Sequence, residues 1–288
     1  MSKIPFYFSV DFEDFTHDLG RSIGNPEPES REKALKISYQ RVQYFSQKFF
    51  DGKKITFFVT GILARKFPEL VKKMFSDGHE IACHYNFHDN INLTNRHDFA
   101  ENLDAAIESI KNATGENPLG FRAPNFAIDE ENLWAYEELA KRFQYDSSYK
   151  TSAHISKTLE GGKLNIDKYS LYEFCIFCLP VLMGSFSIRT GGTFLRLFPS
   201  SLIIKAMHKT KELGHIPLLY IHPYELTLNR DFWVPWHDMK YLSFPKRIIK
   251  WARQVQWAIL GHRGVEKKLS KICEHFEHQG PMRLLINK

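Results

Sequence analysis

Short apolar runs alternate with longer amphipathic stretches through the first half of the chain. The runs predict buried strands at residues 4–10, 54–61, 79–83 and 119–126, the last ending in a turn at Pro124. The longer stretches have apolar positions at helical spacing and predict helices at residues 31–50, 68–75, 98–114 and 129–143. Strands that alternate with helices at this pitch indicate parallel βαβ units, and therefore an α/β fold.

The second half of the chain has a less regular pattern. Residues 151–198 contain several short β-like runs, and residues 199–213 and 216–221 predict a helix followed by a strongly apolar strand. An aromatic, loop-like stretch follows at 226–241, and then two basic helical segments at 246–257 and 266–276. We find no repeat or low-complexity linker. We therefore predict a single domain over residues 1–288, with a core at about 4–225 onto which residues 226–288 pack.

Composition and charge narrow the class of protein only slightly. The 288 residues carry a formal charge of +6, much of it in the last third, which favours acidic partners such as anionic glycans or membrane surfaces. No basic-aromatic motif supports nucleic-acid binding. Four cysteines, including the pair Cys175 and Cys178, suggest buried thiols rather than a disulfide framework. We expect no signal peptide and no transmembrane segment, and hence a cytoplasmic protein.

Two histidines four positions apart follow the third predicted strand. In the segment GHEIACHYNFH at residues 78–88, His84 lies where the strand ends and His88 follows it. A spacing of four places both imidazoles on one side of a helical turn, where a single zinc-like ion can meet them. A surface or capping pair is the simpler alternative. Three acids, Asp11, Glu13 and Asp14, end the first strand, and their mutual repulsion invites a cation or a shared proton.

Five motifs in a fixed order resemble those of the polysaccharide deacetylases, the carbohydrate esterase family 4 proteins with a NodB homology domain. They are SVDFED at 9–14, TFFVTG at 56–61 with the histidine segment, FRAP at 121–124, YDSSY at 145–149 and YIH at 220–222. The resemblance implies a distorted (β/α)7-type barrel. GGTFLRLFP at 191–199, HPYE at 222–225 and residues 263–282 are similar to a branch associated with exopolysaccharide and surface-glycan biosynthesis.

The resemblance implies a metal site and a base near the first strand. Asp11 aligns with the family's carboxylate base, and His84 and His88 align with its metal ligands. The family's common form has two adjacent aspartates here, a base and a ligand, whereas this chain has DFED at 11–14. The third ligand is either Glu13, which shares a strand face with Asp11, or Asp14, which lies past the strand; we favour Asp14. A further option is that Glu13 and Asp14 form the adjacent pair. The cofactor would be a divalent metal, zinc first, with cobalt or nickel as alternatives.

The same resemblance implies roles for residues further along the chain. Arg122 would pair with Asp11 or Asp146, the backbone N–H of Asn125 would bind the oxyanion, and His222 would act as general acid. Asp146 would keep His222 protonated or brace Arg122. Candidate substrate contacts are Pro124, Phe126, Arg196, Glu225 and Trp233, and a structural role is an equal alternative for the last three.

These residues predict a metal-dependent hydrolase that removes N-acetyl groups from an amino sugar. Its substrate would be a surface polysaccharide or a precursor such as a lipid-linked sugar. One alternative is a non-catalytic glycan-binding relative of the fold, for which the altered first motif leaves room. Another is a hydrolase of small amide or formyl C–N substrates. The sequence does not indicate an oligomeric state.

Overall fold

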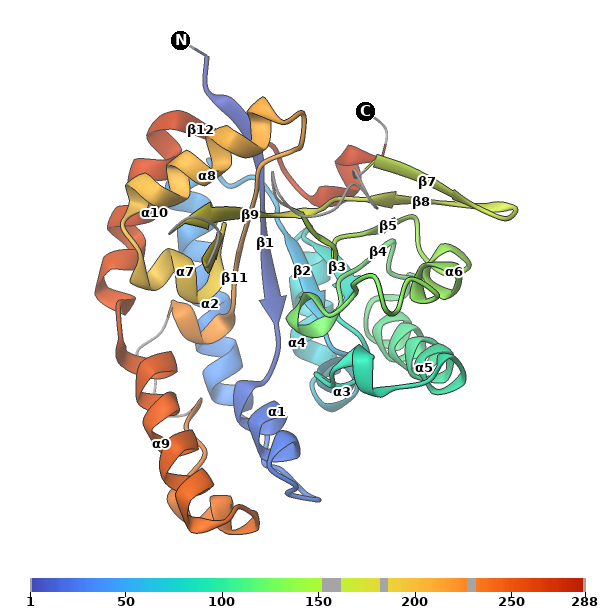
Figure 1. Cartoon of the computed structure of the whole chain (residues 1–288), viewed down its shortest axis with the longest axis vertical. Helices are drawn as coiled ribbons and strands as arrows, with labels where there is room; N and C mark the ends of the chain where they lie inside the picture. Colours follow the sequence, from blue (N-terminus) through green and yellow to red (C-terminus); the bar gives the residue numbers. More distant parts are fainter. Residues whose placement is uncertain (1, 152–161, 182–185, 227–231, 287–288) are drawn as a thin grey trace.

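A computed structural model of the chain describes residues 2–151, 162–181, 186–226 and 232–286, and it shows a sheet surrounded by helices (Figure 1). The main sheet has the order β11-β1-β2-β3-β4-β5-β8-β7, and β12 pairs with β1. All its pairs are parallel except β7 with β8. Its strands are β1 (Ile4–Phe12), β2 (Thr56–Val59), β3 (Glu80–Cys83), β4 (Gly120–Phe121), β5 (Tyr145–Asp146), β7 (Gly162–Ile166), β8 (Tyr169–Glu173), β11 (Leu218–Ile221) and β12 (Phe276–His278).

A second, smaller sheet completes the barrel-like curve. It has the order β10-β9-β6, formed by β6 (Lys150–Thr151), β9 (Ile176–Val181) and β10 (Phe186–Arg189). Because β6 follows β5 and β9 follows β8, this sheet continues the main one past a short break. Its far side returns to β11 through the parallel bridge between Gly191 and Tyr220. The predicted α/β class with a distorted barrel is confirmed, although no single ladder of the described strands closes the ring.

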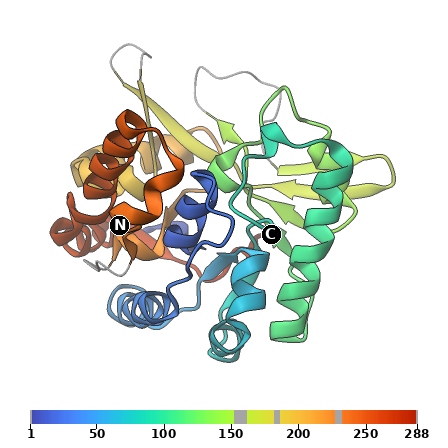
Figure 2. The ribbon, with the colours of Figure 1, turned by 90° about the horizontal axis from the view of Figure 1, so that it is seen from below.

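Ten α-helices among the described residues cover the outside of the sheets. They are α1 (Phe15–Ser22), α2 (Glu32–Phe49), α3 (Gly61–Lys66), α4 (Pro68–Ser76), α5 (Arg96–Thr114), α6 (Ala135–Ala140), α7 (Gly192–Leu197), α8 (Ser200–Glu212), α9 (Phe244–Ile259) and α10 (Val265–His275). Short 3-10 turns connect them: η1 (Ile91–Leu93), η2 (Pro124–Phe126), η4 (Pro223–Glu225), η6 (Trp236–Tyr241), η7 (His262–Gly264) and η8 (Met282–Leu285). Viewed from below, α1 lies near the middle, at the end where β1 points (Figure 2). None of the described helices is both long and apolar enough to cross a bilayer.

Two observed helices differ from the predicted elements. Helix α1, which Asp14 caps, lies in a stretch where no helix was predicted. The helix expected at 129–143 forms only at Ala135–Ala140, because the Asn132 side chain accepts the Asp129 N–H and holds a turn there.

Strand alternation divides the core into an outer and an inner layer. On β1, Phe8, Val10 and Phe12 pack outward against the helices, whereas Tyr7 joins an inner cluster with Phe58. Ser9 and Asp11 share the inward face with Tyr7 by the period of two. Sequence alternation therefore carries a carboxylate into the barrel interior. The cysteines at 83, 175 and 178 are buried free thiols, as predicted.

Candidate metal centre and active site

His84 and His88 lie on a bent loop and not on a helical turn as predicted. β3 ends at Cys83, and Tyr85 takes a left-handed backbone conformation with φ 67°. The carbonyls of Tyr85 and Asn86 accept the first N–H groups of α3, from Gly61 at 2.8 Å and Ile62 at 2.9 Å. The start of a helix thus anchors the loop, and the two imidazole centroids lie 5.5 Å apart.

Gly61 permits this close approach. A Cβ built there would lie 2.7 Å from Asn86 Oδ1 and 2.7 Å from the Cα of Ala106 in α5. Both contacts are shorter than real Cβ atoms make, and one of them is to backbone. Glycine at this position therefore lets α3 sit between α5 and the histidine loop.

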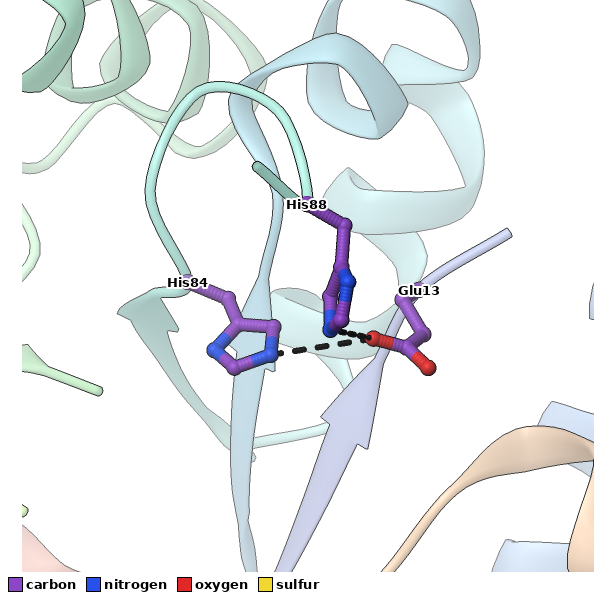
Figure 3. A group of neighbouring side chains, drawn as sticks. All are labelled: Glu13, His84 and His88. Atoms are coloured by element: carbon purple, nitrogen blue, oxygen red, sulfur yellow. Dashed lines mark ion pairs between the residues drawn. The ribbon is translucent and has the colours of Figure 1, made fainter. Parts of the chain in front are cut away.

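Glu13 completes a three-residue cluster with the histidines (Figure 3). Its Oε2 lies 2.7 Å from His88 Nε2 and 3.7 Å from His84 Nε2. His84 Nδ1 lies 2.7 Å from the Arg122 carbonyl, which can only accept a hydrogen bond. The proton therefore sits on Nδ1, and the Nε2 lone pair faces Glu13. This second hydrogen bond is the arrangement that fixes metal-ligating histidines in proteins.

The donor set of this cluster fits a divalent metal ion. Burial alone would raise the pKa of Glu13, but the imidazoles of His88 and His84 hold it well below its usual value. Burial lowers and the Glu13 charge raises the pKa of His88, with a net rise to about 9. Glu13 Oε2 is buried without a hydrogen bond of good geometry among the described residues. Two nitrogens and one carboxylate oxygen converging on one point are ligands that zinc prefers.

Asp14 lies outside the cluster, which corrects our preference for it as the ligand. Its Oδ1 accepts the N–H groups of Thr16 and His17 at the start of α1, and its Oδ2 accepts Arg31 N–H at 2.7 Å. Because α1 begins at Phe15, Asp14 is its N-cap and both oxygens are engaged. Burial raises the pKa of Asp14 to about 6 despite these bonds. Glu13, and not Asp14, lies beside the two histidines.

Asp11 forms a fully buried ion pair with Arg122. Arg122 Nη1 donates to Asp11 Oδ1 at 2.6 Å and to Ser9 Oγ at 2.8 Å. Its Nη2 donates to Ser147 Oγ at 3.0 Å, and its guanidinium carbon lies 4.0 Å from the centroid of the Phe58 ring. Of the two predicted partners, the structure selects Asp11. A guanidinium held from several sides fixes the Asp11 carboxylate in one orientation.

Asp146 supports the turn after β4 and reaches neither Arg122 nor His222. Its Oδ1 accepts the Ser148 hydroxyl at 2.6 Å, and that hydroxyl oxygen accepts the Ala123 N–H at 2.7 Å. Asp146 also shares a hydrogen bond with the buried carboxyl of Glu173. Burial and the Asp146 charge raise the pKa of Glu173 well above its usual value, so Glu173 carries the proton. The role predicted for Asp146 beside His222 is therefore replaced by a role in the turn.

The turn itself has unusual backbone geometry. Asn125 and Phe126 have φ values of 58° and 54°, a left-handed conformation that is strained for a residue such as phenylalanine. Within the described part of the chain, no hydrogen bond engages the exposed Asn125 N–H. Pro124 and Phe126 are buried, and the Phe126 ring packs 4.9 Å from Tyr220. Both side chains support the turn, and their contact with substrate stays a prediction.

His222 follows β11 and belongs to the same electrostatic cluster. Its Nδ1 lies 3.5 Å from Glu225 Oε2, and its ring stacks on Tyr224 with centroids 5.1 Å apart. Burial lowers its pKa, but Glu225, Glu13 and Asp11 together raise it above the usual value. The charges of Asp11 and Glu13 therefore act on His222 as well as that of Glu225.

Arg196 and Glu225 are buried, which favours the structural alternative over a substrate contact for both. Both side chains are at most 1% exposed, and Arg196 Nε lies 3.8 Å from Glu225 Oε1. Arg196 Nη1 donates to the carbonyls of Gln256 and Trp257, which lie in the last turn of α9. Glu225 Oε2 accepts the His222 N–H at 3.1 Å. The pair therefore ties α9 to the strand-end histidine.

Trp233 is half-buried in an aromatic pocket beside His222. Its ring packs 5.2 Å from Trp251. The pocket is lined by Phe15, Tyr224, Phe232, Trp233, Gln254 and Trp257. Because Tyr224 also stacks on His222, the pocket begins one ring away from the candidate acid. A substrate contact therefore stays a prediction for Trp233.

Sequence reasoning missed two acids, the half-buried Asp18 beside the histidine cluster and the buried Glu173 beside Asp146. Asp18 lies on α1 with an unpartnered Oδ2 within the described residues, and its charge raises the pKa of His88. Its spacing of four from Asp14 was the available signal, once α1 is recognised as a helix. Glu173 lies in a short strand of mixed pattern and gives no local signal.

The fold and site define an α/β barrel-like protein with a candidate two-histidine, one-carboxylate metal centre at the carboxyl ends of its strands. Residues 51–143 match the family model of the polysaccharide deacetylases, and residues 153–280 match a domain of unknown function, DUF3473. The match over residues 51–143 confirms the resemblance to the polysaccharide deacetylases for that segment. The narrower likeness to the exopolysaccharide branch stays a prediction.

Curated relatives and solved structures agree with this placement. The chain is 33% identical over 97 residues to the peptidoglycan deacetylase-like protein FGM2 of Gibberella zeae, covering 34% of this chain and 28% of that protein. It is 34% identical over 86 residues to peptidoglycan-N-acetylglucosamine deacetylase of Bacillus cereus, covering 30% and 31%. The chain thus spans less than a third of the length of either relative.

Two solved structures share the fold over nearly all of the chain. A Mycobacterium smegmatis protein assigned to the polysaccharide deacetylases has a TM-score of 0.60 at 16% identity, covering 100% of this chain and 90% of that one. PuuE allantoinase has a TM-score of 0.51 at 13% identity, covering 94% and 89%. At these identities the likeness concerns the fold alone.

Proposed function

We propose that this protein is a metal-dependent N-deacetylase acting on an amino sugar of a surface polysaccharide or its precursor. The observation that carries the proposal is the convergence of Glu13, His84 and His88 on one point beside the buried Asp11–Arg122 pair. The family segment at 51–143 contains both histidines and Arg122. The cytoplasmic compartment and the lipid-linked form of the substrate rest on the sequence prediction.

His84 Nε2, His88 Nε2 and a Glu13 oxygen would hold the ion. A bound divalent metal, zinc or alternatively cobalt or nickel, supplies an acidified water and a Lewis acid for the amide carbonyl. The chain prepares this site by holding the His84 proton on Nδ1 against the Arg122 carbonyl. The anchored loop keeps His88 within reach of Glu13.

Asp11 is the proposed base. Arg122 engages its Oδ1, and no described hydrogen bond engages Oδ2. The Oδ2 lone pairs are therefore available to take a proton from the attacking water. Ser9 and Ser147 fix the guanidinium, so that the base is oriented before substrate arrives.

His222 is the proposed acid toward the leaving amine. Its raised pKa favours the protonated form, which a general acid requires. Its Nδ1 faces Glu225, which leaves Nε2 for the substrate nitrogen. The unengaged Asn125 N–H is the proposed donor to the oxyanion, because the left-handed turn holds it clear of backbone partners.

Metal content and acetate release test the proposal together. Protein purified without chelator should contain near-stoichiometric metal, and His88→Ala should lose it. His97→Ala is a matched control, because His97 belongs to an exposed His–Asp–Glu group with no deacetylase role. Acetate release from N-acetylglucosamine oligomers should require metal and fail in Asp11→Asn.

Two results would count against this function. If the unmodified protein and His88→Ala both fail to take up supplied metal, the non-catalytic glycan-binding alternative is favoured. If His97→Ala loses the metal and His88→Ala keeps it, the Glu13 cluster is not the binding site.

A further inference from the structure

Helix α9 presents apolar side chains to solvent. Phe244, Ile248 and Ile259 are 68%, 48% and 48% exposed, and Ala252 and Val255 complete a row with spacings of four, four, three and four. This spacing places all five on one side of the helix. Ile249, beside this row, is 60% exposed. We call these six residues the α9 stripe.

The segment around the α9 stripe contains cations and no carboxylates. Residues 239–265 hold six Lys and Arg residues, at positions 240, 246, 247, 250, 253 and 263, and no Asp or Glu. The chain has 39 basic and 33 acidic residues, so the rest of it is balanced at 33 of each. The whole net charge of +6 therefore comes from this segment.

Helix stability does not account for these cations. Lys246 and Arg247 lie near the start of α9, where the helix dipole disfavours positive charge, and the first turn holds no acid. None of the six forms an ion pair with a described residue. Arg247 donates to the Trp236 carbonyl and Arg253 lies over the Trp257 ring, so these two have partners in the fold. The other four form no hydrogen bond with a described residue, and Lys246 at the start of α9 costs the helix some stability, which suggests that these cations serve binding.

The opposite side of α9 reaches the candidate active site. Gln254 and Trp257 line the aromatic pocket that begins at Tyr224, next to His222. Trp251 and Trp257 pack on the cluster of Leu19, Ile23, Val234 and Met239, which joins α9 to α1. Figure 1 shows α9 extending past the end of the sheet where β1 points. The α9 stripe and the site therefore lie at the same end of the protein.

We propose that α9 docks this protein on an anionic lipid bilayer, with the α9 stripe in the interface and the surrounding cations against the headgroups. An amphipathic helix that combines a row of apolar side chains with flanking Lys and Arg, and is not apolar all round, is the kind that lies in such an interface. A second copy of the chain fits poorly, because pairing two such segments would bring cations together with no carboxylate to meet them. A soluble anionic glycan would match the cations but leave the isoleucines and Phe244 in water. The docking does not depend on the deacetylase function.

Vesicle flotation of the full chain tests the proposal. The protein should float with phosphatidylcholine vesicles that contain phosphatidylglycerol, should not float with phosphatidylcholine alone, and should be released by high salt. Ile248→Ser/Ile249→Ser should weaken partitioning by about tenfold or more through lost apolar burial. Lys240→Glu/Lys246→Glu should weaken it by about 25-fold or more, since each cation contributes about fivefold near an anionic surface.

Matched variants on other parts of the surface distinguish vesicle binding through α9 from a general effect of surface substitutions. Leu93→Ser removes an apolar side chain that is 86% exposed on η1, and Lys72→Glu reverses an exposed charge on α4; both should float like the unmodified protein. Circular dichroism should show all variants folded.

Three results would overturn the proposal. The first is failure of the unmodified protein to float with anionic vesicles. The second is flotation of both α9 double variants to the same extent as the unmodified protein. The third is dissociation of a dimer by Ile248→Ser/Ile249→Ser, seen by light scattering with vesicle binding unchanged, which would assign the α9 stripe to a second copy.

Discussion

The carboxyl pair of Asp146 and Glu173 makes a pH-dependent contribution to stability that one substitution can isolate. Both groups are buried, and burial together with the Asp146 charge raises the pKa of Glu173 well above 4.5. Folding therefore takes up a proton at Glu173. The free energy of unfolding should then fall as pH rises above the unfolded pKa, by about 1.4 kcal/mol per pH unit while the folded carboxyl stays protonated.

Glu173→Gln removes this proton without removing the shape. The amide keeps a donor for Asp146 and an acceptor for the Tyr149 N–H, which now bonds Glu173 Oε1 at 3.2 Å. Where the unfolded carboxyl is still protonated, below about pH 4.5, we expect the variant to differ from the unmodified protein by no more than about 1 kcal/mol. As pH rises, the variant should become relatively more stable by about 1.4 kcal/mol per unit.

Urea unfolding of both proteins at pH 6, 7 and 8 measures the difference directly. Other titrating groups cancel when the two curves are subtracted. Glu108→Gln, on the exposed face of α5, is the control and should follow the unmodified protein at every pH. Parallel pH dependences for the unmodified protein and Glu173→Gln would refute a protonated Glu173.

Three further substitutions probe the candidate site. Gly61→Ala should destabilise the fold by about 1–3 kcal/mol, because its Cβ would overlap α5 backbone and the histidine loop, and should weaken metal retention in elemental analysis. Arg122→Met should cost about 3–5 kcal/mol in urea unfolding, because Asp11 is left charged and buried without its partner. Glu225→Gln should move the alkaline limb of the activity–pH profile to lower pH, because Glu225 helps to raise the pKa of His222.

Each of these has a control and a contradicting result. Gly264→Ala, where an added Cβ meets nothing closer than 3.6 Å, should leave stability and metal unchanged. Adding Asp11→Asn to Arg122→Met should recover part of the lost stability; additive losses would mean that the two side chains do not interact. An unchanged alkaline limb in Glu225→Gln would exclude His222 as the group that titrates there.

The sequence predicted those features of the site that depend on local periodicity. Alternation along β1 directs Asp11 inward, and the end of β3 positions His84. Both depend only on where a strand begins and ends, which apolar runs indicate well. The order of the motifs supplied Arg122 and His222.

The sequence could not predict features that depend on distant partners. The choice between Glu13 and Asp14 depends on α1, a short polar helix whose Leu19 packs against Val234, more than two hundred residues further on. The burial of Arg196 could not be predicted, because the carbonyls that accept its hydrogen bonds lie in α9, about sixty residues further along the chain. Tertiary packing decides such cases, and it cannot be read from the local sequence pattern.

The two late neighbours of β1 bear on how the protein is made. β11 pairs with Tyr7 to Val10, and β12 pairs with Ile4 to Phe6. His278 also accepts the Phe8 N–H across a separation of 270 residues. While the ribosome is still translating the second half of the chain, one edge of this very apolar first strand has no partner. Contacts between such distant residues slow folding and leave an intermediate with exposed apolar surface. We therefore expect the nascent protein to depend on chaperones.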